Sequence, residues 1–229
     1  MPASEVHNTD CLEYMRTLPD KAFELAIADP PYGIGEDGAK NHTRGKLAAP
    51  KLYTPKEWDS KAPDKEWFDE LLRVSKHQII WGANHFISRI PYDSPCWVVW
   101  DKENGENDFA DCELAWASFP SAVRRFKFRW AGMLQGNMAN KEERIHPTQK
   151  PVALYAWLLK HYAKPGDRIF DPMMGSQSSR IAAYKMGFDY VGCELDKEYF
   201  AKGCERFDRE CRGIYKSDNG NTYQQTKLF

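Results

Sequence analysis

Apolar residues recur along this chain with two different periods, and each period predicts one kind of element. Short apolar runs predict buried strands, and they lie at 24–28, 78–81, 96–101, 168–171 and 190–194. Apolar residues at helical spacing predict helices, and these lie at 8–20, 65–76, 152–163, 177–186 and 197–210. The last third therefore runs strand, turn, helix, strand, helix, which predicts a doubly wound α/β sheet.

Two further strands are expected at 112–118 and 122–130, and the second has a strict alternation. Its aromatic residues alternate with cations, namely Phe126, Phe128 and Trp130 with Arg125, Lys127 and Arg129. A period of two places the aromatic rings on one face of the strand and the cations on the other. The cationic face is either a solvated surface or a basic rim along bound DNA.

The stretch from Gly33 to about Ser60 has no clear periodicity and predicts a long loop. Between positions 39 and 56 it carries only cations among its charged residues, namely Lys40, Arg44, Lys46, Lys51 and Lys56. Loops of this length in compact domains are usually functional or mobile. The cations predict either a solvated loop or contacts with nucleic-acid phosphates.

Length and composition predict one globular domain at residues 1–216, with loop insertions at 36–60 and 103–145. The polar tail at 217–229 is expected to be disordered until its last residues. Six cysteines without a CxxC pair indicate reduced thiols and no metal site. The sequence contains neither a membrane-length apolar stretch nor a signal peptide, so a cytoplasmic location is expected. The formal charge of -1 leaves nucleic-acid binding to the local basic stretches.

The tetrapeptide Asp29-Pro30-Pro31-Tyr32 directly follows the apolar run at 24–28. Two consecutive prolines end a strand abruptly, so a carboxylate, two carbonyls and an aromatic ring are presented at its carboxyl end. Ligands bind at this edge of open α/β sheets. The alternative is a strand that ends in a proline turn with an incidental aspartate.

A second candidate site is the turn at 171–176, which joins a predicted strand to a predicted helix. The next strand ends in Glu194, where a carboxylate can accept hydrogen bonds from ribose hydroxyls. A dinucleotide would require G-x-G-x-x-G for its pyrophosphate, whereas this turn contains only Gly175. The missing glycines favour S-adenosylmethionine, which carries no phosphate.

With these pieces placed, the chain resembles the N6-adenine DNA methyltransferases of the permuted, or beta, group found in bacteria and phages. The resemblance is carried by three motifs in this order: Asp29-Pro30-Pro31-Tyr32-Gly33, His146 to Pro151, and Phe170 to Ser176 with Glu194. It implies the Rossmann-like methyltransferase fold with circularly permuted motifs, a mostly parallel doubly wound sheet and helices on both faces. Related RNA and protein methyltransferases usually carry the cofactor turn first, so the order favours DNA.

The resemblance also implies roles for individual residues. The catalytic residues would be Asp29, Pro30, Pro31 and Tyr32, with the carboxylate and the Pro30 carbonyl accepting the amine hydrogens and the ring stacking on a flipped base. The cofactor residues would be Asp10, Asp29, Thr148, Lys150, Asp171, Pro172, Gly175, Ser176, Gln177 and Glu194. An N-cap role explains Asp10 equally well.

Gln177 departs from the family pattern, which commonly has glycine at this position. A glutamine is tolerated with ordinary dihedral angles and can contact the ligand, but a positive φ would impair binding. A DNA-binding, clamp-associated module with a decayed cofactor site is therefore a competing hypothesis. Cytosine-N4 methylation and an NAD-dependent oxidoreductase are further alternatives.

The last five residues, Gln225 to Phe229, resemble the peptide by which bacterial replication proteins dock onto the sliding clamp. The alternative is a tail that folds back on the domain. Other expected partners are double-stranded DNA, which would make the protein nucleoid-associated, and a second copy of the chain in a homodimer. The DNA-binding residues would be Lys40, Arg44, Lys46, Arg125, Lys127 and Arg129. No membrane partner is expected.

Overall fold

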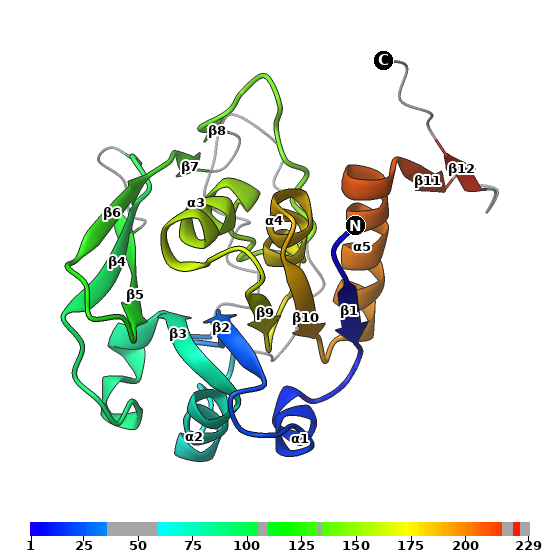
Figure 1. Ribbon diagram of the computed structural model, residues 1–229. Helices are drawn as coiled ribbons and strands as arrows, with labels where there is room; N and C mark the ends of the chain where they lie inside the picture. Colours follow the sequence, from blue (N-terminus) through cyan, green and yellow to red (C-terminus); the bar gives the residue numbers. More distant parts are fainter. Residues whose placement is uncertain (36–58, 105–109, 132–133, 217–221, 225–229) are drawn as a thin grey trace. The chain divides into compact units, whose positions relative to one another are not determined.

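The structure, a computed structural model, describes all residues except 36–58, 105–109, 132–133, 217–221 and 225–229 (Figure 1). The basic residues predicted at 40, 44 and 46 and the predicted clamp peptide at 225–229 lie outside the described residues. The chain divides into two compact units, one formed by residues 1–17 and 144–229 and the other by residues 18–143. The predicted single domain at 1–216 stays a prediction.

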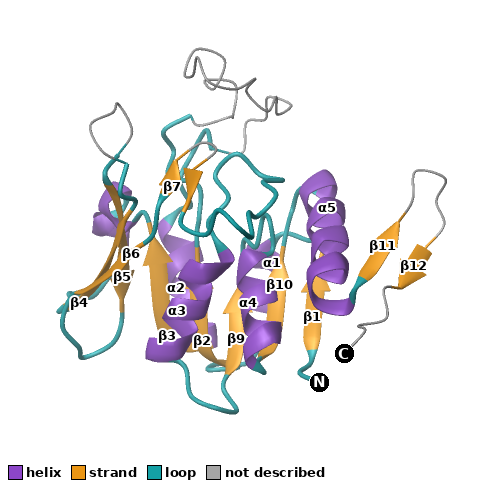
Figure 2. Ribbon diagram, turned by 90° about the horizontal axis from the view of Figure 1, so that it is seen from above, coloured by secondary structure: helices purple, strands orange, loops and turns teal. Residues whose placement is uncertain are grey.

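The unit formed by the two ends of the chain contains three parallel strands in the order β1, β10, β9. They are β1 (Ser4–His7), β9 (Arg168–Asp171) and β10 (Asp189–Cys193). Its helices are α1 (Cys11–Arg16), α3 (Val152–Tyr162), α4 (Ser178–Met186) and α5 (Lys197–Phe207). α3 packs against α4, and α4 packs on β10 (Figure 2).

After α5 the same unit continues with a π-helical turn at Asp208–Arg212 and a hairpin. The hairpin consists of β11 (Ile214–Lys216) and β12 (Thr222–Gln224), which are antiparallel. Residues 222–224 of the predicted disordered tail therefore form a strand that pairs with β11.

The unit formed by residues 18–143 contains a mixed sheet in the order β2, β3, β5, β4, β6. Its strands are β2 (Phe23–Ala28), β3 (Ser75–Trp81), β4 (Cys96–Asp101), β5 (Cys112–Ala117) and β6 (Arg124–Lys127). β5 is antiparallel to both neighbours, whereas β2 is parallel to β3 and β4 is parallel to β6. Strand β2 carries the tetrapeptide at its carboxyl end.

One helix, two 3-10 turns and a short hairpin are the other described elements of this unit. They are α2 (Lys65–Val74), the 3-10 turns η2 (Ala83–His85) and η3 (Ile87–Arg89), and a hairpin of β7 (Trp130–Ala131) and β8 (Leu134–Gln135). The predicted strand at 122–130 is thus interrupted, since β6 ends at Lys127 and β7 begins at Trp130.

The apolar runs become strands because both of their faces are covered. In β2, Leu25 and Ile27 on one face are each 1% exposed, and Ala26 and Ala28 on the other face are each 0% exposed, so burial does not alternate in this part of the strand. A strand of this kind is typical of a sheet that is packed on both sides. In β4, by contrast, burial alternates: Val98 and Trp100 are buried, and the residues on either side of each are half-buried. The fold class predicted from these patterns, a mostly parallel α/β sheet, is confirmed.

All six cysteine thiols are free. Burial raises the pKa of Cys211 to about 11, so this thiol stays protonated at neutral pH. Among the helices in the described parts of the chain, none combines the length and the apolar character needed to cross a bilayer.

Candidate active site

The tetrapeptide leaves β2 as predicted and forms a compact polar end to the strand. Pro30 is buried, while Asp29 and Tyr32 are half-buried. The Tyr32 hydroxyl donates a hydrogen bond to Asp29 Oδ1 over 2.9 Å. The carboxylate and the aromatic ring of the motif are therefore held together at the carboxyl end of a parallel strand, where ligands bind in α/β sheets.

The backbone after the tetrapeptide is anchored by Asp59, which is 3% exposed. The backbone N–H of Gly33 donates to Asp59 Oδ1 over 2.9 Å. Gly33 has a φ of +73°, and a Cβ at this position would lie 2.9 Å from the backbone nitrogen of Ala62. Only glycine fits here, because a side chain would be both strained and in contact with backbone. Nothing in the sequence pattern marked Asp59.

The ring of Tyr32 is held by two residues that sequence reasoning missed. Gly82 follows β3 in a left-handed conformation, and a Cβ there would lie 2.1 Å from Tyr32 Cε1. The imidazole of His85 stacks on the tyrosine ring, with 5.0 Å between the ring centroids and 16° between the planes. In this structure the stacking partner of Tyr32 is thus a side chain of the protein itself.

In the unit formed by the chain ends, Asp171 stabilises the predicted cofactor turn through two hydrogen bonds. The residue is 1% exposed. Its Oδ1 accepts from the Met173 backbone N–H over 3.0 Å, and its Oδ2 accepts from the Ser179 hydroxyl over 2.5 Å. The carboxylate therefore ties the turn to the first residues of α4, and Pro172 beside it is also buried.

Gly175 and Glu194, which the sequence predicted for one site, are in direct contact. The Gly175 N–H donates to Glu194 Oε2 over 2.8 Å, while Glu194 Oε1 accepts from the Asp196 N–H over 2.8 Å. Burial raises the pKa of Glu194, and the two backbone hydrogen bonds oppose that increase because they favour the charged form. The carboxylate fixes the turn against the end of β10.

Gln177 has the positive φ that the sequence analysis treated as unfavourable, with φ 60° and ψ 25°. Its side chain is fully buried and fills the space beside Gly203 in α5. The amide nitrogen donates to the Phe200 carbonyl over 3.2 Å, and the amide oxygen accepts from Arg180 over 2.8 Å. The side chain is thus committed to α4–α5 packing, which leaves only the backbone of Gln177 for the predicted cofactor contact.

A buried arginine that the sequence did not single out supports the same turn. Arg206 is 0% exposed. It donates to the Ser176 carbonyl over 3.1 Å and to the Ser178 hydroxyl over 2.9 Å. Its charge is compensated by Glu210 at 2.8 Å. Ser176, another predicted cofactor residue, is therefore held through its backbone.

The His146-to-Pro151 motif approaches the turn through its histidine. A Cβ at Gly175 would lie 3.8 Å from the His146 ring, and this ring also contacts that of Tyr199 with 4.2 Å between centroids. The Thr148 hydroxyl lies 3.1 Å from His146 Nδ1, so it is linked to the turn through the imidazole. Thr148 is exposed, whereas Lys150 is buried.

Asp10 has the N-cap role that was the alternative to a cofactor contact. Its Oδ1 accepts from the backbone N–H groups of Leu12 and Glu13 over 2.7 and 3.1 Å. The carboxylate therefore begins α1, and a contact with the cofactor stays a prediction.

The cations on and after β6 are exposed, and the aromatic residues between them are less so, as the alternation predicted. Arg125 lies 4.0 Å from Asp101, and Lys127 lies 3.0 Å from Glu103. Arg129 donates to the Glu103 carbonyl over 3.2 Å. Acidic partners thus reduce the local positive charge, and the basic rim along DNA stays a prediction.

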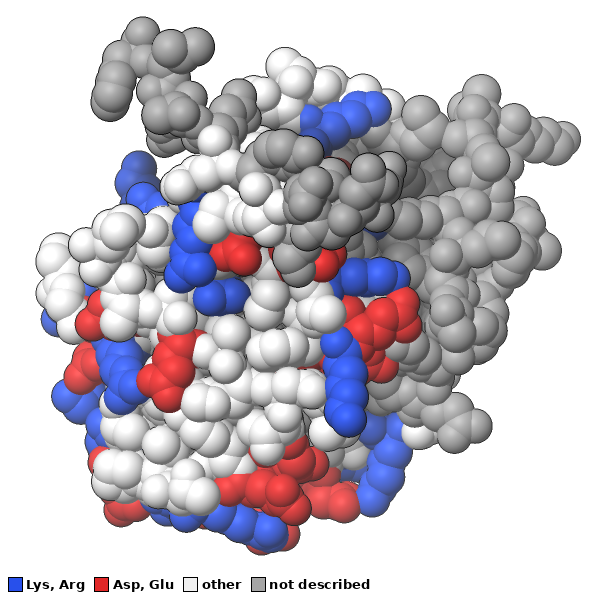
Figure 3. All heavy atoms as spheres, turned by 90° about the vertical axis from the view of Figure 1, so that its right-hand side faces the viewer, with Lys and Arg blue, Asp and Glu red and all other residues white. Residues whose placement is uncertain are grey.

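Charged side chains of both signs are interspersed on the face shown in Figure 3. Ion pairs occur within α5 and within the turn after it. Lys202 and Glu198 of α5 are 2.6 Å apart, and Arg212 and Asp208 of the turn are 3.1 Å apart. Such exposed pairs contribute little to stability.

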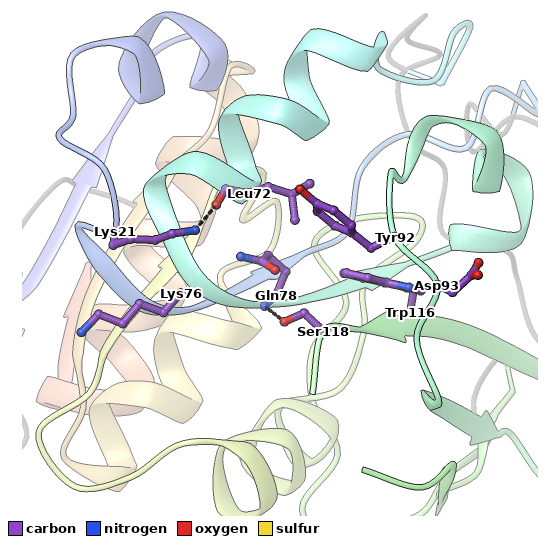
Figure 4. A pocket seen from close by; sticks show the side chains of 8 residues that line it. All are labelled: Lys21, Leu72, Lys76, Gln78, Tyr92, Asp93, Trp116 and Ser118. Atoms are coloured by element: carbon purple, nitrogen blue, oxygen red, sulfur yellow. Dashed lines mark hydrogen bonds between the residues drawn. The ribbon is translucent and has the colours of Figure 1, made fainter. Parts of the chain in front are cut away.

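A shallow pocket of about 290 Å³ lies elsewhere in the unit of residues 18–143 (Figure 4). Its lining residues are Lys21, Leu72, Lys76, Gln78, Tyr92, Asp93, Trp116 and Ser118. None of them was predicted for a site. β2 and β3 are parallel, and the tetrapeptide follows the carboxyl end of β2. Lys76 is the second residue of β3 and Gln78 is the middle one, so these lining residues are not at the carboxyl end of the strand.

The fold is the α/β methyltransferase fold, shared with solved DNA methyltransferases. The M1.HpyAVI–SAM complex aligns with a TM-score of 0.57 at 20% identity, covering 89% of this chain and 98% of that one. The cytosine-N4-specific PvuII DNA methyltransferase aligns with a TM-score of 0.56 at 12% identity, covering 96% and 95%.

Sequence comparison also finds similarity to DNA methyltransferases. Residues 96–204 match the family model described as DNA methylase. The type II methyltransferase M.HinfI of Haemophilus influenzae is 27% identical over 83% of this chain, and M.HpaI of Haemophilus parainfluenzae is 24% identical over 92%. The chain spans 64% of M.HinfI and 76% of M.HpaI. The chain is thus similar in sequence to type II DNA methyltransferases over most of its length.

Proposed function

We propose that this protein transfers a methyl group from S-adenosylmethionine to the N6 amino group of adenine in DNA. The observation that carries the proposal is the Asp29-to-Tyr32 tetrapeptide at the carboxyl end of parallel strand β2, with the tyrosine hydroxyl bonded to the aspartate. The match of residues 96–204 to the DNA methylase family supports it.

The tetrapeptide suits the chemistry of an exocyclic amine. The lone pair of this nitrogen is delocalised into the purine ring, so the amine is a poor nucleophile. Asp29 and the Pro30 carbonyl would accept its two hydrogens, draw the nitrogen toward tetrahedral geometry and stabilise the positive charge that develops there. S-adenosylmethionine supplies an activated methyl group, and in-line attack needs no covalent enzyme intermediate. The base must leave the helix to be reached, and Tyr32 offers a stacking platform.

The residues around Gly175 fit this cofactor. The turn presents backbone without a side chain at Gly175, and Glu194 beside it would accept hydrogen bonds from the ribose. Thr148 and Lys150 belong to the segment proposed to reach the methionine carboxylate. The relative M1.HpyAVI was crystallised with SAM.

Two alternatives to adenine-N6 methylation are cytosine-N4 methylation and a DNA-binding module that no longer binds the cofactor. Asp29, rather than serine, as the first residue of the tetrapeptide favours adenine over cytosine N4, although a cytosine-N4-specific enzyme shares the fold. The positive φ of Gln177 motivates the second alternative, a module that has lost its cofactor. Calorimetry with S-adenosylmethionine separates that module from an enzyme, because the module would show no binding heat.

The proposed partners follow from the substrate. Double-stranded DNA would contact the cations on and after β6, Arg125, Lys127 and Arg129, together with the predicted basic loop residues Lys40, Arg44 and Lys46. Docking of Gln225 to Phe229 onto a bacterial sliding clamp, and a homodimer, are further proposals. Deletion of residues 225–229 should abolish a pull-down with the clamp.

The test of the activity is methyl transfer from labelled S-adenosylmethionine to unmethylated DNA, followed by nucleoside mass spectrometry. We expect N6-methyladenine with the unmodified protein and a loss of about a hundredfold or more in kcat for Asp29→Ala. Asp69→Ala is the matched control, because this carboxylate pairs with Lys65 on the surface of α2. N4-methylcytosine as the product, or full activity of Asp29→Ala, would contradict the proposal.

A further inference from the structure

The Tyr32 hydroxyl lies within hydrogen-bonding distance of two carboxylates. It is 2.9 Å from Asp29 Oδ1 and 3.5 Å from Glu113 Oε2. Glu113 belongs to β5, so a residue more than eighty positions away in the sequence reaches the tetrapeptide. All three groups lie in the same compact unit, residues 18–143.

The second carboxylate is held in place by a lysine. Lys102 Nζ lies 2.5 Å from Glu113 Oε1, and the side chains are 17% and 21% exposed. Lys102 follows β4 directly, and its ammonium also lies 5.3 Å from the centre of the Trp100 ring. Trp100 in turn is paired with Glu113 across β4 and β5. One oxygen of Glu113 thus binds the ammonium, while the other faces Tyr32.

A tyrosine hydroxyl has a single hydrogen to donate, and the hydrogen rotates to suit its acceptors. While it points at Asp29, it takes up one acceptor position on Oδ1 of the carboxylate that is proposed to accept a hydrogen of the substrate amine. Glu113 Oε2 offers a second acceptor for the same hydroxyl hydrogen.

We propose that Glu113 is a positioning residue that receives the Tyr32 hydrogen bond when an amine binds Asp29, so that Asp29 Oδ1 loses this hydrogen bond and can accept one from the amine. The proposal rests on the proposed function. No bond forms or breaks, since the proton stays on the tyrosine oxygen and only its direction changes. Lys102 compensates the charge of Glu113, which would otherwise repel the Asp29 carboxylate close by.

The test uses Glu113→Gln in the full chain. Lys102 is a cation, so it will hold the amide oxygen and turn the amide NH₂ toward Tyr32. The hydroxyl then finds a donor where it had an acceptor and stays on Asp29. We expect kcat to fall about tenfold, in line with a lost hydrogen bond to a charged group. The Kd for S-adenosylmethionine should not change.

A double-mutant cycle with Tyr32→Phe separates positioning from general structural damage. Without the hydroxyl, Glu113→Gln should cause no further loss of kcat. The double variant Lys102→Gln/Glu113→Gln removes the cation that orients the amide, so the amide oxygen can again accept from Tyr32 and part of the lost kcat should return. The matched control is Glu24→Gln, which removes a carboxylate bound to Lys76 at 3.0 Å in the same unit and should leave kcat unchanged.

The possible outcomes are distinguishable. Unchanged kcat in Glu113→Gln, or equal losses in the presence and absence of the Tyr32 hydroxyl, would overturn the role of Glu113 while the methyltransferase proposal stands. Absence of methyl transfer by the unmodified protein would overturn both. A loss of kcat that disappears in the Tyr32→Phe background, with unchanged cofactor affinity, would support the inference.

Discussion

Gln177 combines an unfavourable backbone conformation with a favourable side-chain environment. A left-handed conformation costs a residue with a side chain about 1 kcal/mol or more. Its buried amide is hydrogen-bonded to both α4 and α5, through Arg180 and the Phe200 carbonyl. The side-chain contacts therefore offset the backbone strain, and the helix begins at Ser178 without a side-chain cap.

Two substitutions separate these contributions. Gln177→Ala keeps the strain and loses the contacts, whereas Gln177→Gly loses the contacts and the strain together. We expect both to lower the free energy of unfolding, with the alanine variant about 1 kcal/mol less stable than the glycine variant. Urea denaturation monitored by circular dichroism measures the difference. An alanine variant as stable as the glycine variant would show that the backbone is unstrained.

At the scale of elements, short helices depend on aspartate caps. Asp10 begins α1, and Asp196 begins α5 by accepting from the N–H groups of Glu198 and Tyr199 over 2.9 and 3.0 Å. α1 spans only Cys11–Arg16, so it has too few turns to be stable without its cap and its packing. The position of Asp10 follows from the cap whether or not the cofactor also contacts it.

Two variants of Asp10 distinguish the cap from the proposed cofactor contact. Asp10→Asn retains a cap acceptor and should leave the thermal midpoint unchanged, whereas Asp10→Ala should cost about 1 kcal/mol. If the charge also contacts the cofactor, the asparagine variant will bind S-adenosylmethionine more weakly despite its unchanged stability. Scanning calorimetry and titration calorimetry give the two quantities. A destabilised asparagine variant would argue against a simple cap.

At the scale of the whole molecule, the two ends of the chain build one unit and the middle builds the other. β1, near the N-terminus, pairs with β10 near the other end of the sequence, from Ser4 beside Tyr190 to His7 beside Cys193. The Glu194 backbone then donates to the His7 carbonyl over 3.0 Å. The half-buried Glu194 at the predicted cofactor turn is thus linked to the pairing of the two chain ends.

Glu194 should make the free energy of unfolding depend on pH. Burial raises its pKa in the folded chain, so the folded state binds the proton more tightly than the unfolded state does. The associated stability is complete below the unfolded value of about 4.3 and is lost as the pH rises through the raised folded value. Glu194→Gln lacks this ionisation. The difference in unfolding free energy, unmodified protein minus variant, should fall across that interval in urea titrations, and a constant difference would contradict this.

The sequence by itself determined most of the longer strands and helices and the order of the motifs. Strands that are buried on both faces require continuous apolar runs, so β2 could be located from hydrophobicity alone. The shorter apolar stretches of β4 and β9 located those strands in the same way. The contact between Gly175 and Glu194 was also within reach, because the ends of neighbouring parallel strands meet at one edge of a sheet. β1 could not be found in this way, since its Ser-Glu-Val-His sequence is polar and its pairing with β10 defines it.

Only the tertiary structure decided what surrounds each predicted site residue. His85 on the ring of Tyr32, Glu113 at its hydroxyl and Arg206 at the Ser176 carbonyl come from distant elements. Hydrophobic periodicity reports which residues are buried, but it contains no information about which polar atoms meet. Those contacts depend on strand register and helix packing, which bring together residues far apart in the sequence.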